Sequence, residues 1–161
     1  MWQSDRNGVL EGAALKGYYS PYIMEGGAAK DRIAIDRIEI NGRSCKATCS
    51  MKEYYTSPTD TVGFHLSVQR SVDFLTQIAC IHALYLNGRE TKDVEIWMPD
   101  FQITLTKPQR DPNNIQISMD LFARSSAQSK GASKNELSFY KWKFDIGDGG
   151  WWGVVTYCLP V

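Results

Sequence analysis

The most informative pattern in the chain is an apolar run near its middle, at residues 63–86. Hydrophobic side chains recur there at helical spacing on two neighbouring faces. One face carries Val72, Leu75, Ala79, Ala83 and Leu86, and the other carries Phe74, Ile78, Ile81 and Tyr85. A helix without a broad polar side has no face to turn toward water. We therefore expect a helix over residues 68–86 that lies in the middle of the fold.

Alternation of apolar and polar residues predicts strands on both sides of this helix. Before the helix, residues 32–40 alternate, Asn41-Gly42 predicts a hairpin turn, and residues 43–53 return as a second strand. After the helix, four strands are predicted at 94–106, 115–124, 137–146 and 151–159. Pro99 marks the first of these four as an edge strand or the site of a bulge.

Small and polar residues predict the connections. Asn87-Gly88 is a stop signal for the helix, with Gly where a positive φ is tolerated. Residues 125–135 read as a mobile loop and 147–150 as a tight turn, while residues 1–20 form an arm or a short helix. No repeat or interdomain linker interrupts the chain, so residues 1–161 are expected to form a single domain.

The order strand, strand, long helix, four strands is accounted for by one antiparallel sheet curled around a central helix. This is an α+β class and corresponds to the hot-dog arrangement; a plain α+β sandwich is the alternative. Hot-dog domains normally pair, so a homodimer or higher homo-oligomer is expected.

Composition removes several classes of function. Lys and Arg number 18, as do Asp and Glu, so there is no excess of positive charge for nucleic acid. The four cysteines include no CxxC pair and are expected to be buried, reduced thiols of a cytoplasmic protein. The start of the chain lacks the pattern of a signal peptide, and polar residues within the helix argue against a membrane span.

Polar residues within the apolar helix are the first candidates for chemistry. Asp73, Thr76 and Gln77 stand near its beginning, and a buried carboxylate needs partners or a purpose. Asp73 is a candidate general base, although an acid near the start of a helix is also favoured by the helix dipole alone. Ser67 suits a helix N-cap, and His82, among apolar neighbours, is expected to be a core or interface histidine.

The segment 73–79 resembles the Glu-Ala-x-Ala-Gln-x-Ala segment of hot-dog dehydratases and thioesterases, with Asp73 at the acid and Gln77 at the glutamine. Gly63-Phe64-His65 resembles the Gly-His-Phe that precedes their helix. The Gly-His-Phe-Pro-Gly of the dehydratases is absent, as is their longer spacing from His to acid. A standard β-hydroxyacyl dehydratase is therefore not expected.

Residues 20–160 are more closely similar, in element order, to the FcoT-like group of long-chain fatty acyl thioesterases. Pro21-Tyr22 matches a Pro-Tyr whose tyrosine is functional in that group, and Tyr54 or Tyr55 matches a second tyrosine at a strand end. Two asparagines that are important in the group fall near Ser67 and Thr76, so neither is retained.

This resemblance implies an enzyme acting on fatty acyl thioesters of CoA or acyl carrier protein. The implied reactions are hydrolysis and, in relatives from natural-product pathways, conjugate addition of an amino acid such as glycine to a 2-enoyl thioester. The expected catalytic residues are Asp73, His65, Tyr55 and Tyr22, and the expected substrate-binding residues are Ser67, Arg70, Thr76, Gln77 and Tyr54. In the addition, Asp73 or His65 would be the base and Arg70 would hold the amino acid carboxylate.

No metal and no other cofactor is expected, because the two histidines stand seventeen positions apart without a Cys/His cluster. Two alternatives remain open: a β-hydroxyacyl thioester dehydratase or isomerase that uses Asp73 with His65, and a non-catalytic acyl-binding module that has lost the chemistry.

Overall fold

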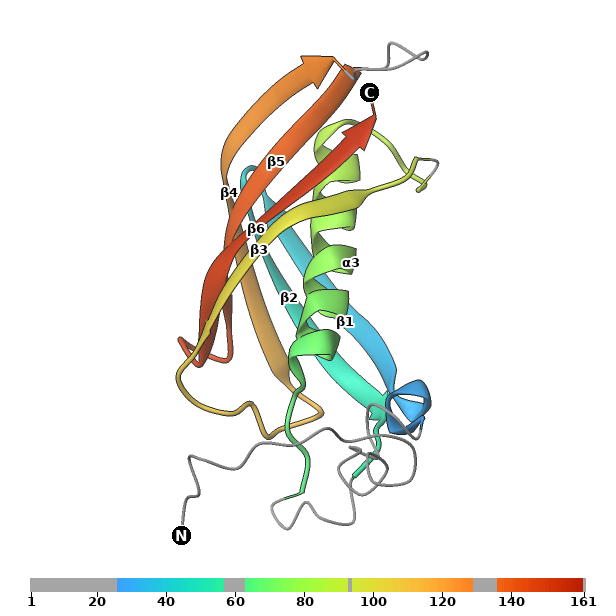
Figure 1. The fold of residues 1–161 in the computed structure, drawn as a ribbon, viewed down its shortest axis with the longest axis vertical. Helices are drawn as coiled ribbons and strands as arrows, with labels where there is room; N and C mark the ends of the chain where they lie inside the picture. Colours follow the sequence, from blue (N-terminus) through green and yellow to red (C-terminus); the bar gives the residue numbers. More distant parts are fainter. Residues whose placement is uncertain (1–25, 57–62, 93, 129–135, 161) are drawn as a thin grey trace, which may run out of the picture.

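A computed structural model describes residues 26–56, 63–92, 94–128 and 136–160. Within these ranges six strands form one antiparallel sheet in the order β1-β2-β4-β5-β6-β3, and the sheet curls around the α-helix α3 (Figure 1). The elements are a 3-10 turn η1 (Gly27–Lys30), β1 (Arg32–Asn41), β2 (Ser44–Glu53), α3 (Val68–Leu86), β3 (Trp97–Leu105), β4 (Ile115–Gln128), β5 (Glu136–Ile146) and β6 (Trp151–Pro160). The expected α+β class and element order are confirmed.

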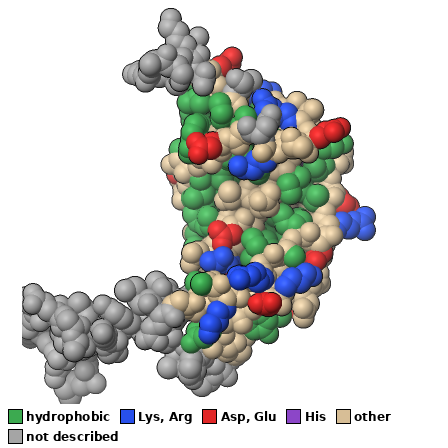
Figure 2. All heavy atoms as spheres, turned by 90° about the vertical axis from the view of Figure 1, so that its right-hand side faces the viewer, with side chains coloured by type: hydrophobic (Ala, Val, Ile, Leu, Met, Phe, Trp, Pro, Cys, Tyr) green, Lys and Arg blue, Asp and Glu red, His purple; other side chains and the backbone are tan. Residues whose placement is uncertain are grey.

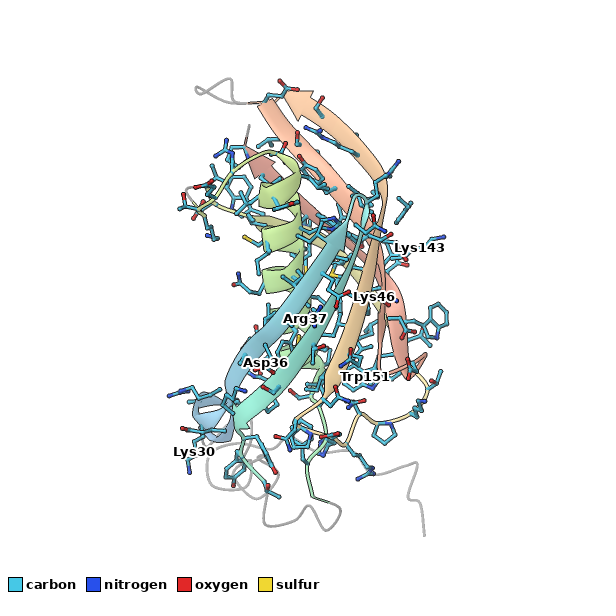
Figure 3. The ribbon with its side chains drawn as sticks, turned by 180° about the vertical axis from the view of Figure 1, so that it is seen from behind. Lys30, Asp36, Arg37, Lys46, Lys143 and Trp151 are labelled. Carbon is cyan, nitrogen blue, oxygen red and sulfur yellow. The ribbon has the colours of Figure 1, made fainter. Side chains whose placement is uncertain are left out.

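The core lies between α3 and the concave side of the sheet. Phe74, Leu75 and Ile78 of the helix are completely buried. They belong to one cluster with the inward-facing residues of the strands, among them Ile115, Ile117 and Met119 of β4, Trp142 and Ile146 of β5, and Val155 and Tyr157 of β6. Lys46 and Lys143 lie on the opposite, outer side of the sheet (Figure 3), and the alternation of the strands thus separates core from solvent.

Both ends of α3 are capped as the sequence predicts. The Ser67 hydroxyl accepts a hydrogen bond from the Arg70 N–H at 3.2 Å, which makes Ser67 the N-cap. At the other end the Arg89 N–H donates to the Leu84 carbonyl at 2.9 Å, and Gly88 adopts a φ of 67°. This is a Schellman arrangement, in which glycine is favoured because its φ is positive.

The side of α3 that faces away from the sheet differs from expectation. The periodicity predicts a helix surrounded by other elements, but within the described part of the chain the sheet covers one side only. Tyr85 is 64% exposed, and Leu86 and Val68 are exposed as well. Figure 2, which views the molecule from the side where α3 lies in Figure 1, shows hydrophobic side chains on this surface. Apolar residues therefore occur on both sides of the helix, but only one of these sides packs against the sheet.

Three local boundaries also differ from the sequence analysis. The first hairpin turn is Gly42-Arg43, one residue later than expected, because Asn41 still pairs with Ser44. In β1 the register shifts between Ile35 and Arg37, so the isoleucines are three positions apart there, from Ile35 to Ile38, and the strand is not strictly alternating. Strand β4 continues to Gln128, into the predicted loop 125–135, because β5 supplies a partner for each of its last residues.

Strand β3 fulfils the expectation for Pro99. It is the edge strand next to β6, and the register is irregular between Trp97 and Asp100, the interval that contains Pro99. A proline lacks the N–H that a ladder needs, and an edge bulge tolerates that loss. The segment 1–20, expected to be an arm or short helix, lies outside the described residues.

His82 is a core histidine, as expected. It is completely buried, and Trp142 donates its Nε1–H to His82 Nδ1 at 3.1 Å. Since the indole nitrogen is only a donor, Nδ1 accepts and the hydrogen resides on Nε2, which donates to the Gly42 carbonyl at 2.8 Å. One imidazole therefore links α3 to β5 and to the β1–β2 turn.

Gly153 in the middle of β6 is required by close approach of backbone. An added Cβ would stand 1.9 Å from the Gln102 carbonyl oxygen of β3 and 3.0 Å from the ring of Phe144. Phe144 of β5 stacks on Phe101 of β3 at a centroid distance of 5.9 Å. Gly153 is the β6 residue paired with Phe144 and lies between these two strands, so the stacked rings span a strand that has no side chain at this point.

We expect Gly153→Ala to lower the free energy of unfolding by about 3 kcal/mol, because the methyl group displaces β3 or the Phe101–Phe144 pair. Urea unfolding measures this loss. Gly150→Ala is the control, with a smaller expected loss, because an added Cβ there stays 3.2 Å from the flexible Lys107 side chain and 3.3 Å from the Gly147 carbonyl oxygen, and its φ is not positive. Equal stability of Gly153→Ala and the wild type would show that the backbones do not approach this closely.

Candidate functional site

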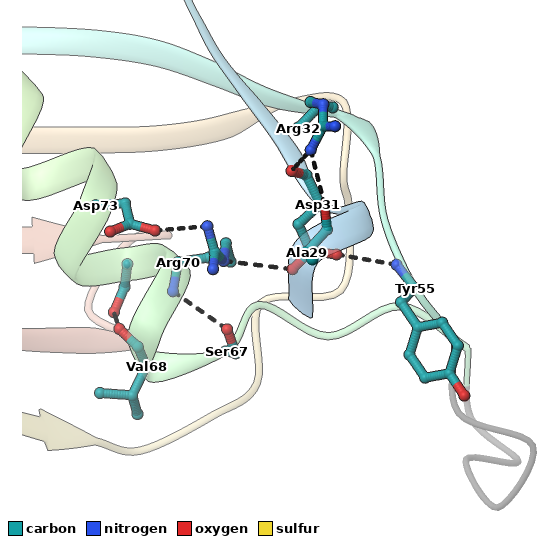
Figure 4. Close-up of polar contacts among 9 residues, drawn as sticks. Ala29, Asp31, Arg32, Tyr55, Ser67, Val68, Arg70 and Asp73 are labelled. Carbon is teal, nitrogen blue, oxygen red and sulfur yellow. Dashed lines mark hydrogen bonds and ion pairs between the residues drawn. The ribbon is translucent and has the colours of Figure 1, made fainter. Parts of the chain in front are cut away.

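Two carboxylates and one guanidinium meet at the beginning of α3 (Figure 4). Arg70 Nη1 lies 2.7 Å from Asp73 Oδ2, and Arg70 Nε lies 3.4 Å from Asp31 Oδ2. Asp31 is 7% exposed, and its other oxygen accepts the backbone N–H of Tyr55 at 2.9 Å. A buried carboxylate with an ionic partner and a hydrogen bond avoids the cost of desolvated charge. Asp31 thereby joins the start of β1, the end of the β2 segment and α3.

Asp73 is held on one oxygen and open on the other. Its side chain is about two-fifths exposed, and Arg70 fixes Oδ2 across one turn of the helix. Since α3 begins at Val68, Asp73 is the sixth helical residue, about 8 Å beyond the helix start by the rise per residue. The N–H groups at the helix terminus therefore lie about one turn or more away from Asp73.

Two hydroxyl groups lie one turn further along. Thr76 Oγ1 and the Tyr157 phenol oxygen are 2.7 Å apart. Burial raises the pKa of Tyr157 to about 12; the hydrogen bond with Thr76 lowers the pKa, and the negative charge of Asp73 raises it. Tyr157 therefore remains a neutral phenol around neutral pH. Asp73, Thr76 and Tyr157 combine one carboxylate with two hydroxyls close to it.

The remaining predicted site residues take different positions, and among them Tyr55 contacts Asp31. Tyr55 is half-buried and contributes its backbone N–H to Asp31, while Lys30 lies 5.2 Å from the centre of its ring. Tyr54 is exposed and packs edge-on against Phe64. His65 is exposed and lies two residues before the N-cap. The next residue, Leu66, donates its backbone N–H to the Gln109 carbonyl. Tyr22 lies outside the described residues.

A groove runs over the C-terminal half of the open side of α3. It has a volume of about 480 Å³ and is lined by Gln77, Cys80, Ile81, Leu84 and Tyr85 of the helix and by the segment 89–92. This volume lies within the range of small-molecule sites. Gln77, predicted to bind substrate, is exposed and belongs to the groove.

The sequence analysis missed Asp31 and Tyr157. Asp31 precedes a strand in a charged stretch, and no sequence pattern indicates that it reaches Arg70. Tyr157 shares one face of β6 with Val155 and Leu159, a pattern typical of core residues. Only the fold shows that its hydroxyl meets that of Thr76.

Neither a metal site nor a membrane helix is found in the part of the chain described. Within these ranges there is no group of three or more His, Cys, Asp or Glu residues suited to holding a metal. No helix among them is long and apolar enough to cross a bilayer. The four cysteines are free and buried, as expected, and burial raises the pKa of both Cys45 and Cys49 to about 12.

The cluster is chemically suited to orienting water and binding a developing negative charge. A carboxylate with one free oxygen accepts a proton from water, and neutral hydroxyls donate hydrogen bonds to an oxyanion. Arg70 is already shared between Asp31 and Asp73. The guanidinium is thereby less suited to bind a third carboxylate, such as that of the amino acid in the predicted addition reaction.

Comparison with known proteins adds no family. No protein-family model matches the chain. No significant match to a curated protein is found.

The raised pKa of Tyr157 predicts a loss of stability in alkali. The unfolded phenol ionises near pH 10 while the folded one stays neutral to about pH 12, so the folded state binds the extra proton in this window and stability falls as the pH rises through it. We expect Tyr157→Phe to remove about 1 kcal/mol of the decrease between pH 10 and 11. Urea unfolding at several pH values measures this slope. Cys45 and Cys49 add to the decrease in both proteins, and identical slopes would contradict the assignment.

Proposed function

We propose that this protein is a hot-dog enzyme that hydrolyses fatty acyl thioesters of CoA or acyl carrier protein. The observation that carries the proposal is the Asp73–Thr76–Tyr157 cluster, with Asp73 oriented by Arg70, on a helix held within a curled antiparallel sheet. The sheet order supports the hot-dog assignment: the strand before the helix pairs with the second strand after it, and the strand directly after the helix lies at an edge.

The proposed reaction uses groups of this chain for each step. Asp73 takes a proton from a water molecule through its free oxygen while the water oxygen attacks the thioester carbonyl. Thr76 and Tyr157 are hydrogen-bonded to each other, so one of the two hydroxyls donates to the other, and the second donates its hydrogen to the oxyanion that forms. Collapse of the intermediate breaks the C–S bond, and the proton held by Asp73 passes to the leaving thiolate. The products are a free fatty acid and the thiol of the carrier.

The addition of an amino acid to an enoyl thioester gains no specific support. It needs a cation for the carboxylate of the amino acid, and the candidate for that role, Arg70, lies against two carboxylates of the protein. Hydrolysis needs no such cation. The dehydratase alternative needs His65 with Asp73, and the acyl-binding module needs only the groove.

We expect Asp73→Asn to lower kcat for decanoyl-CoA by about a hundredfold or more, the usual contribution of a general base. Release of CoA thiol, followed by a colorimetric thiol reagent, measures the rate. Asp148→Asn is the matched control, because Asp148 is exposed in the β5–β6 turn with a φ of 51°, a conformation that Asn accepts.

Mass spectrometry of the products separates the alternatives. Free acid from saturated thioesters supports hydrolysis. Decenoyl-CoA incubated with glycine would give a product heavier by one glycine if addition occurs, and conversion to the 3-hydroxyacyl thioester would identify a dehydratase. Full turnover by Asp73→Asn would remove Asp73 from the mechanism, and an absence of any product would contradict the proposal.

The expected homodimer is part of the proposal. It is supported by β3, which pairs on one side only among the described strands. The bulge before Asp100 limits the regular part of that edge to residues 100–105.

We expect a mass of two chains, or a multiple of two, in size-exclusion chromatography with light scattering. Ile103→Pro tests the edge pairing, because proline removes a ladder N–H and is excluded from central strands. Ile103→Val, which keeps the backbone N–H at the same position, is the control. A monomer at micromolar concentration in the wild type would contradict the proposed dimer.

A further inference from the structure

The open side of α3 changes from polar to apolar along its length. Asp73, Gln77, Ile81 and Tyr85 follow one another at intervals of four residues, so they lie in one stripe along the helix. Cys80 and Leu84 flank this stripe and belong with its second half to the groove of about 480 Å³. The stripe therefore begins at the open carboxylate of Asp73 and ends on apolar side chains.

The groove reaches toward the proposed catalytic cluster at Gln77. Gln77 lines the groove and lies one turn beyond Asp73 in the same stripe of the helix. From Asp73 to Leu84 the helix rises by about 16 Å. A ligand that reaches from one to the other is long and thin, with a polar end and an apolar end.

The far end of the groove has a polar rim. Residues 89–92, Arg-Glu-Thr-Lys, follow the Schellman turn and line the groove together with Leu84 and Tyr85. The charge of Lys92 lies close enough to Cys80 to lower its pKa, against the larger effect of burial, which raises it. The interior is therefore apolar beneath a charged edge.

We propose that this groove binds the acyl chain of the substrate and that Ile81, with Tyr85, determines the chain length the enzyme accepts. The proposal rests on the proposed thioester function and adds to it the position and direction of the chain: carbonyl at Asp73 and Thr76, terminal methyl group toward Leu84. The match lies in polarity, since an acyl thioester is polar at its carbonyl and apolar along its chain. Short chains end before Ile81 and do not reach the apolar half.

Two variants test the groove, each with a matched control on the same helix. Ile81→Trp fills the groove, and Leu86→Trp introduces the same side chain at an exposed position outside it. Tyr85→Lys places an ammonium in the groove at a residue that is 64% exposed, so the fold tolerates it, and Leu86→Lys is its control. Circular dichroism and thermal unfolding verify that all four fold.

We expect kcat/KM for decanoyl-CoA and palmitoyl-CoA to fall at least about tenfold in both groove variants, while butyryl-CoA is hydrolysed at the wild-type rate. Both controls should match the wild type at every chain length. Equal effects on all chain lengths, or none on any, would overturn the proposal.

Binding of S-decyl-CoA, a thioether that cannot be hydrolysed, separates failure of the groove from failure of the proposed function. Suppose that the wild type hydrolyses no thioester but binds S-decyl-CoA in isothermal titration calorimetry, and that both groove variants bind it about tenfold more weakly. The groove then binds an acyl chain although the protein has no thioesterase activity. Absence of binding, or equal binding by all proteins, overturns it. Conversion of a dimer to a monomer by the groove variants, without a change in chain-length preference, would show that a second copy covers this surface and would also overturn it.

Discussion

The structure depends on burial of one side of α3 within the curvature of the sheet. Phe74, Leu75 and Ile78 are completely buried, and each such side chain contributes about 2 kcal/mol through removal of apolar surface from water. The sheet depends on the helix in turn, because the inward-facing residues of β4, β5 and β6 belong to the same apolar cluster. Helix and sheet therefore stabilise each other.

Polar contacts determine how the helix sits within this apolar contact. His82 fixes its middle between Trp142 and the Gly42 carbonyl, and Arg70 fixes its beginning to the buried carboxylate of Asp31. Hydrophobic burial alone would permit the helix to slide or rotate, whereas directional hydrogen bonds do not. The same contact that orients the helix also orients Asp73, so the fold and the proposed site share a single anchor at Arg70.

Much of the fold was predictable because the signals are local. Periodicity identified the helix and six strands, Ser67 and Gly88 marked the helix ends, and Pro99 marked an edge bulge. The errors arose where the structure of a segment depends on which other segment packs against it. Polar residues of β4 up to Gln128 became strand because β5 pairs with them, and one side of the helix stayed open because only the other meets the sheet.

For the proposed site, the sequence pointed to Asp73, Thr76 and Gln77 as candidates, because they lie on one helix at recognisable spacing. It missed Asp31 and Tyr157 because their roles arise from contacts across 39 and 81 positions of the chain, as the Arg70–Asp31 pair and the Thr76–Tyr157 pair show. A lone carboxylate before a strand and a tyrosine in an alternating strand resemble many others until the fold brings their partners together.

The stacked rings of Phe101 and Phe144 make the two edges of the sheet unequal in mechanical terms. The rings span Gly153, so detaching β3 from β6 also strips contact from β5, one strand further in. No aromatic pair among the described residues joins β1 to a strand beyond its neighbour, and its pairing with β2 is interrupted by two register shifts. Thermal fraying should therefore begin at β1, with its backbone amides exchanging with deuterated solvent sooner than those of residues 101–105.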